Sequence, residues 1–227
     1  MAARGISSFS LRNSLPAGIS APSPGRTTAE CSRQQAGATC TRVIMDLWRW
    51  LPEPTMPTST QCALEGGCDC RAVRYRLTSP PLVVHCCHCR WCQRESGASF
   101  ALNAMIESTC VVDLGIAPDI VDTPSQSGRG QKIARCPRCR LALWSHYFGS
   151  GPVTRFIRVG TLDNPDVLPP DVHIFTSSKQ PWVALPPGMP AFAEYYDRKT
   201  VWSAASLERF EIVKPLIEAY RAARDGV

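Results

Sequence analysis

Residues 87–92 read CHCRWC, and two further cysteine clusters flank them in the sequence, CDC at residues 68–70 and CPRC at residues 136–139. Seven of the twelve cysteines lie in these clusters. Spacings this short direct two or three sulfur atoms at one point, as zinc ligands do, whereas disulfide frameworks spread their cysteines along the chain. We therefore predict that the chain binds zinc in a reducing compartment, where thiols stay free.

The two-cysteine clusters are expected to form one closed zinc site together. A structural zinc ion has four protein ligands in a tetrahedron, and each of these clusters supplies two. The site would connect parts of the chain that are about sixty-five residues apart. Its predicted ligands are Cys68, Cys70, Cys136 and Cys139.

The remaining cluster is expected to hold a second zinc ion. Catalytic zinc has three protein ligands and keeps a fourth position open for water or substrate, and Cys87, Cys89 and Cys92 supply three thiolates. The alternative is a second structural site, with a fourth ligand from Cys86, His85, His88 or a distant residue. A redox role for the Cys-x-x-Cys spacing has less support, because no βαβ pattern surrounds it.

The overall composition is that of an ordinary globular protein, with 44% hydrophobic residues and a mean hydropathy of -0.12. No apolar run approaches the roughly 20 residues that a membrane helix needs. Half of the formal net charge of +6 lies in the first sixty residues, and the rest of the chain is too evenly charged for a nucleic-acid-binding face. We therefore expect no membrane partner and no nucleic-acid partner; the oligomeric state does not follow from the sequence.

The chain divides into three segments. Residues 1–60 are rich in Ser, Arg, Ala, Pro and Gly without periodicity, and we interpret them as disordered. Their alternatives are a mitochondrial targeting peptide and an artificial extension, so a cytoplasmic location is predicted, with a mitochondrial one as the alternative. Residues 62–210 are the predicted zinc-binding domain. Residues 211–227 are a helical tail, and Pro215 should break or kink the helix.

Short alternating runs between Gly and Pro residues predict a mainly β domain of antiparallel strands. The predicted strands include residues 73–77, 100–106, 141–144, 156–159 and 172–175. Residues 112–130 are rich in Pro, Ser, Gly and Asp, and they predict a long loop between strands.

The cysteine clusters belong to a longer series of motifs. These are GGCDC at residues 66–70, CHCRWCQR at 87–94, SG at 96–97, CPRC at 136–139, LW at 143–144, GTLD at 160–163, HIF at 173–175 and KQPW at 179–182. In this order the motifs resemble those of the glutathione-dependent formaldehyde-activating enzymes, a family that also includes centromere protein V. The resemblance covers roughly residues 64–210.

The resemblance implies a β-tent fold, in which twisted antiparallel sheets are held together by zinc, and the helical tail would follow it. It also implies two zinc ions, with the same division of the cysteines into four structural ligands and a catalytic trio. The sequence departs from the family pattern at Arg71 and Arg140, where glycine usually follows the second cysteine of the cluster. A non-glycine residue there must avoid a positive φ or bear strain.

By resemblance, the chain is a carbon–sulfur lyase that adds the thiol of glutathione reversibly to formaldehyde and forms S-hydroxymethylglutathione. Zinc with an open position can bind the thiolate and polarise the aldehyde oxygen. Glutathione has two carboxylates, and the candidates to bind them are Arg90, Arg94 and Lys179, each of which could equally be a solvated surface cation. Two alternatives stay open: a similar enzyme for another thiol or small electrophile, and a noncatalytic zinc module for protein or chromatin contact.

Overall fold

The computed structural model describes residues 64–226, and the predictions for residues 1–60 lie outside this range. Three strands form a small antiparallel sheet in the order β1-β2-β5. Their bounds are Leu64–Gly67 for β1, Arg74–Leu77 for β2 and Val111–Asp113 for β5.

A second sheet has seven strands in the order β10-β3-β4-β9-β8-β7-β6. In chain order the strands are Val83–Cys87 (β3), Ala101–Glu107 (β4), Asp119–Thr123 (β6), Gln131–Arg135 (β7), Ala142–Tyr147 (β8), Thr154–Arg158 (β9) and Val172–Ile174 (β10). Neighbouring strands are antiparallel apart from β10, which reaches β3 after a long connection and pairs with it in parallel. The expectation of antiparallel strands thus fails at this one edge.

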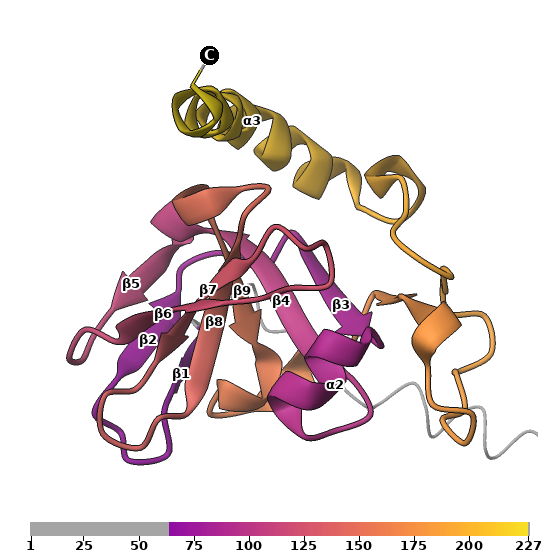
Figure 1. The fold of residues 1–227 in the computed structure, drawn as a ribbon, viewed down its shortest axis with the longest axis horizontal. Coiled ribbons are helices and arrows are strands. Elements are labelled where there is room, and N and C mark those ends of the chain that lie inside the picture. Colours follow the sequence, from indigo (N-terminus) through magenta and orange to yellow (C-terminus); the bar gives the residue numbers. More distant parts are fainter. Residues whose placement is uncertain (1–63, 227) are drawn as a thin grey trace, which may run out of the picture. The chain divides into compact units, whose positions relative to one another are not determined.

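Two α-helices accompany the sheets in the described range. Helix α2 (Arg90–Ser96) directly follows β3, and helix α3 (Ala204–Asp225) lies near the C-terminal end (Figure 1). Short 3-10 helices are Ser108–Cys110, Gly151–Val153, Val159–Thr161, Pro165–Val167, Thr176–Ser178 and Arg198–Thr200. Among residues 64–226, no helix combines the length and the apolar character needed to cross a membrane.

The large sheet is buried on both faces. Along β4, Ala104 and Ile106 belong to one hydrophobic core together with Tyr75 of the small sheet, whereas Met105 belongs to a second core together with Phe210 of α3. Successive side chains of a strand point to opposite faces. The small sheet and α3 therefore cover opposite faces of the large sheet, which explains why all five residues of β3 are buried.

The predicted fold class is confirmed, since the described chain is mainly β with two sheets and a C-terminal helix. The loop predicted for residues 112–130 was wrong, because β6 lies within them and pairs with β7. The predicted break at Pro215 was also wrong, because α3 continues through it, and the alternative of a kink there stays a prediction. Glu211 and Pro215 are both exposed, so water can satisfy the Glu211 carbonyl that loses its amide partner.

Candidate metal centres

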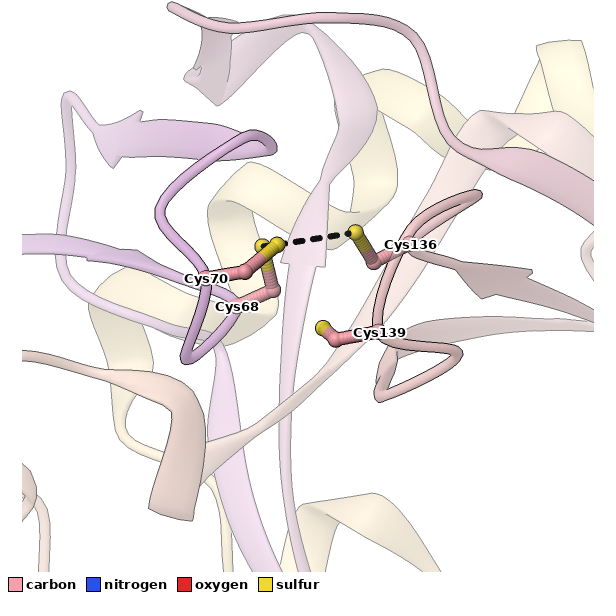
Figure 2. Close-up of side chains that lie close together, drawn as sticks. All are labelled: Cys68, Cys70, Cys136 and Cys139. Atoms are coloured by element: carbon pink, nitrogen blue, oxygen red, sulfur yellow. Dashed lines mark hydrogen bonds between the residues drawn. The ribbon is translucent and has the colours of Figure 1, made fainter.

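Four cysteine sulfur atoms converge between hairpins of the two sheets. Cys68 and Cys70 follow β1, and Cys136 and Cys139 lie between β7 and β8 (Figure 2). The Sγ atoms are 3.4 Å apart between Cys68 and Cys70 and 3.6 Å apart between Cys70 and Cys136, and all four lie within 4.8 Å of one another. Zinc–sulfur bonds of about 2.3 Å place the sulfurs of a tetrahedron about 3.8 Å apart. The four-cysteine site therefore fits one tetrahedral zinc ion.

A backbone hydrogen bond closes a tight turn in each half of the four-cysteine site, over four residues in the first half and five in the second. Arg71 N donates to Cys68 O, and Arg140 N donates to Cys136 O, each at 2.9 Å. These turns place Arg71 at φ 59° and Arg140 at φ 63°, in the left-handed region that favours glycine. A non-glycine residue at these positions was expected either to avoid a positive φ or to bear strain. The chain shows the second outcome, because both arginines have a positive φ.

The other three cysteines, the cysteine trio, converge within one short segment. Cys87 is the last residue of β3, Cys89 is the N-cap of α2, and Cys92 lies in the first turn of α2. Their Sγ atoms lie within 4.8 Å of one another, and all three side chains are buried. The Cys-x-x-Cys spacing thus does open a helix after a strand, which the sequence had not indicated. The next strand, β4, is antiparallel to β3, so the segment is not a βαβ unit.

The electrostatics of the trio favour a bound cation. Hydrogen bonds from Cys87 and Cys92 lower the pKa of Cys89 to about 3. Hydrogen bonding to Cys89 and Cys92 raises the pKa of Cys87. One thiolate is thus stabilised by neighbours that keep their protons. A divalent cation would stabilise all three thiolates together, and this set of donors suits zinc.

Among residues 64–226, no further Cys, His, Asp or Glu ligand atom joins the group of three. The nearby candidates for a fourth ligand have other partners. His85 Nε2 lies 2.8 Å from the Tyr196 hydroxyl. Cys86 and His88 belong to a separate buried group. The trio is therefore a three-ligand site in the described part of the chain.

The separate group consists of Cys86, His88 and His173. His88 Nε2 lies 2.8 Å from His173 Nδ1, which is a hydrogen-bond distance. Two nitrogen ligands of a tetrahedral zinc ion would be about 3.3 Å apart. We interpret the two histidines as a hydrogen-bonded pair that supports the trio segment. Sequence spacing could not reveal it, because the partners are 85 residues apart.

A cavity of about 370 Å³ lies beside the trio, and all three cysteines of the trio line the cavity. Most of the remaining wall is apolar or aromatic, and it includes Trp91, Met105, Phe156, Trp202, Phe210 and Ile217. These side chains come from α2, from the large sheet and from α3 with the segment before it. None of the cysteines of the four-cysteine site lines the cavity. Of the two cysteine sites, a small molecule in the cavity would therefore contact only the trio.

A family model described as glutathione-dependent formaldehyde-activating enzyme matches residues 63–178, just over half of the chain. The chain belongs to this family. Both cysteine sites lie entirely within the matched residues. In this member of the glutathione-dependent formaldehyde-activating enzyme family, α3 lies beyond the matched part, yet it forms one wall of the cavity.

The chain is similar to a bacterial relative and to a solved bacterial structure. A protein of Halomonas elongata is 29% identical over 127 residues, which are 54% of this chain and 80% of that protein, and it carries the provisional name glutathione-dependent formaldehyde-activating enzyme. A crystal structure of a Rhodobacter sphaeroides protein is 19% identical, covers 45% of this chain and 93% of that chain, and has a TM-score of 0.35. A structural likeness this low carries no argument about the fold.

The three cations suggested by the sequence as substrate contacts do not line the cavity. Arg90 Nη1 donates to Gln93 Oε1 at 2.8 Å, and Lys179 Nζ donates to Val183 O at 2.7 Å. Arg94 lies exposed in the last turn of α2. Their role in substrate binding stays a prediction. The cations that line the cavity are Arg129, Arg158, Arg198 and Arg221, which come from four separate segments of the chain.

Proposed function

We propose that this chain is a zinc-dependent enzyme that adds the thiol of glutathione reversibly to formaldehyde and forms S-hydroxymethylglutathione, a carbon–sulfur lyase reaction. The observation that carries the proposal is the convergence of Cys87, Cys89 and Cys92 on one cavity, without a further ligand from the described residues. Family membership and the name of the Halomonas relative support the choice of the two reactants.

The two cysteine sites have different roles in this proposal. The four-cysteine site holds a structural zinc ion, because its ligand set is complete and it lies outside the cavity lining. The trio holds the catalytic zinc ion, which would supply positive charge and an open coordination position for the substrate. The chain would thus bind two zinc ions.

The reaction forms one carbon–sulfur bond and transfers one proton. The glutathione sulfur loses its proton and bonds to the aldehyde carbon, while the carbonyl oxygen gains a proton and becomes a hydroxyl group. The apolar side chains of the cavity wall lower the local dielectric constant, which strengthens the electrostatic interactions beside them.

Exchange spectroscopy by NMR can separate catalysis from the spontaneous addition. Formaldehyde labelled with ¹³C is equilibrated with glutathione, and the exchange rate between the free and adduct signals is measured with and without zinc-loaded protein. We expect an increase of at least about tenfold, equivalent to about 1.4 kcal/mol in the barrier. Cys89→Ser should abolish the increase, whereas Cys110→Ser should keep it, because Cys110 lies outside both sites. No increase with the unmodified protein would contradict the proposal.

Glutathione binding is tested separately from turnover. A ligand present at a hundredfold excess over its Kd stabilises the folded state by about 2.7 kcal/mol. Millimolar glutathione should therefore raise the Tm of the zinc-loaded protein. The absence of any shift in Tm would show that glutathione is not the substrate. The remaining hypotheses would then be an enzyme for another thiol and a noncatalytic zinc module.

A further inference from the structure

The cavity has a positively charged lining. Four arginines line it, Arg129, Arg158, Arg198 and Arg221. The one carboxylate in the lining, that of Glu95, is already paired with Arg135. None of the four arginines forms an ion pair with any residue between 64 and 226. The cavity is therefore suited to an anionic ligand.

Arg158 of β9 is half-buried and has only neutral partners. Its Nη1 donates to Asn103 Oδ1 at 2.7 Å, and its Nη2 donates to Ser145 Oγ at 3.4 Å. Both partner side chains are themselves buried. A guanidinium has five N–H donors, so these bonds leave roughly three without a protein partner in the described chain. Withdrawing a cation from water without a carboxylate partner costs free energy, which points to a role beyond stability.

Arg155, on the same strand, shows how the chain stabilises an arginine for structure alone. Its Nη1 and Nη2 donate to the two carboxylate oxygens of Asp113 at 2.6 and 3.0 Å, and its guanidinium stacks on the ring of Trp144. Arg155 does not line the cavity. Arg155 and Arg158 thus differ in how their charge is balanced. Asp113 pairs with Arg155, whereas no carboxylate among residues 64–226 pairs with Arg158, which lines the cavity.

We propose that Arg158 binds a carboxylate of the thiol substrate beside the trio, and that it thereby selects anionic thiols over neutral ones. This inference rests on the proposed function and names the residue that recognises the substrate class. A guanidinium binds a carboxylate through two parallel hydrogen bonds. The apolar neighbours Met105 and Phe156 lower the local dielectric constant and strengthen that pair. Glutathione belongs to this class of thiols.

The test compares Arg158→Gln with Arg155→Gln as the matched control and Arg158→Lys as the conservative variant. KM is measured for glutathione and for 2-mercaptoethanol, a neutral thiol, with formaldehyde as the second substrate. Arg158→Gln should raise KM for glutathione by about ten- to hundredfold, as expected for a lost charged hydrogen bond. It should leave KM for 2-mercaptoethanol and the zinc content unchanged. Arg158→Lys should recover part of the affinity, and Arg155→Gln should change neither KM.

Three results would overturn the inference: an unchanged KM for glutathione, an equal increase in KM for both thiols, or loss of zinc. The last two results would mean that Arg158 supports the metal site and does not recognise the substrate carboxylate. Calorimetric binding of S-methylglutathione, which cannot react, gives a readout independent of turnover. If the unmodified protein binds it in an Arg158-dependent manner without catalysing the addition, the proposed function fails and the inference stands. If catalysis occurs but binding is absent or independent of Arg158, the inference alone fails.

Discussion

The four-cysteine site and the trio use the same ligand atom but are built in different ways. The first connects a hairpin of the small sheet to a hairpin of the large sheet, and its Cys70 and Cys136 are 66 residues apart. The second is contained in residues 87–92, where β3 ends and α2 begins. Closing a long loop costs more conformational entropy than closing a short one. A metal ion in the first site would therefore contribute to the fold, and one in the second site chiefly to chemistry.

The cysteines of the proposed structural site are more exposed to solvent than those of the proposed catalytic site. Cys70 and Cys139 of the four-cysteine site are exposed, whereas all three cysteines of the trio are buried. The buried site is nevertheless the one that a ligand can reach, because the trio lines the cavity beneath α3. In the proposed function, reactivity therefore depends on an open ligand position next to the cavity, and not on exposure of the sulfur atoms.

Replacing one ligand in each site should give the largest contrast. Cys136→Ser removes a buried thiolate from the site that connects the sheets, and we expect loss of the cooperative fold, because the binding free energy of structural zinc is folding free energy. Cys89→Ser should keep the far-ultraviolet circular dichroism of the unmodified chain and lose one equivalent of zinc. Elemental analysis and circular dichroism on the same samples measure both effects.

Cys110→Ser is the matched control for both substitutions, because Cys110 is a half-buried cysteine outside the metal-binding groups. It should change neither the zinc content nor the spectrum. If Cys89→Ser unfolds the domain as completely as Cys136→Ser, the two sites do not differ in role, and both are structural.

Stepwise removal of metal should show an intermediate contrast in the unmodified chain. Three protein ligands hold an ion less tightly than four, and the trio is accessible through the cavity. We expect a chelator to remove the first equivalent of zinc without a change in circular dichroism, and the second together with the β-sheet signal. A colorimetric zinc indicator and circular dichroism, followed in parallel, would show two phases. Release of both equivalents in a single phase with simultaneous unfolding would argue against the division of roles.

Sequence spacing was enough to predict which cysteine sulfur atoms come together, because the trio is local and the two remaining pairs complete each other's ligand count. Whether they bind zinc stays a prediction. The cavity could not be predicted in the same way. Arg158 lies on β9 and Phe210 on α3, and they line one cavity only after the large sheet and the helix have packed.

Alternating burial made some strands predictable, although β4 and β10, which are almost entirely buried, were also predicted. Strand β2 alternates between buried and less buried residues and was found, whereas β3 is buried throughout and lacks a period of two. Strand β6 lies at the edge of the large sheet and has no fully buried residue, so its composition resembled that of a loop. These misses follow from tertiary position and not from local propensity.

The smallest contrast concerns the backbone next to each site. Arg71 in the four-cysteine site has φ 59°, whereas α2 beside the trio ends at Gly97 with φ 68°. A left-handed non-glycine residue costs roughly 1–2 kcal/mol, part of which a glycine loses again through the greater freedom of the unfolded chain. We expect Arg71→Gly to raise the free energy of unfolding by about 1 kcal/mol and Gly97→Ala to lower it by about 1 kcal/mol, as measured by urea titration of the zinc-loaded protein. A methyl group at Gly97 would meet no atom within 4 Å, so that loss would report backbone strain alone. If Arg71→Gly is destabilising instead, the arginine contributes contacts that outweigh its strained conformation, and the four-cysteine site depends on more than its ligands.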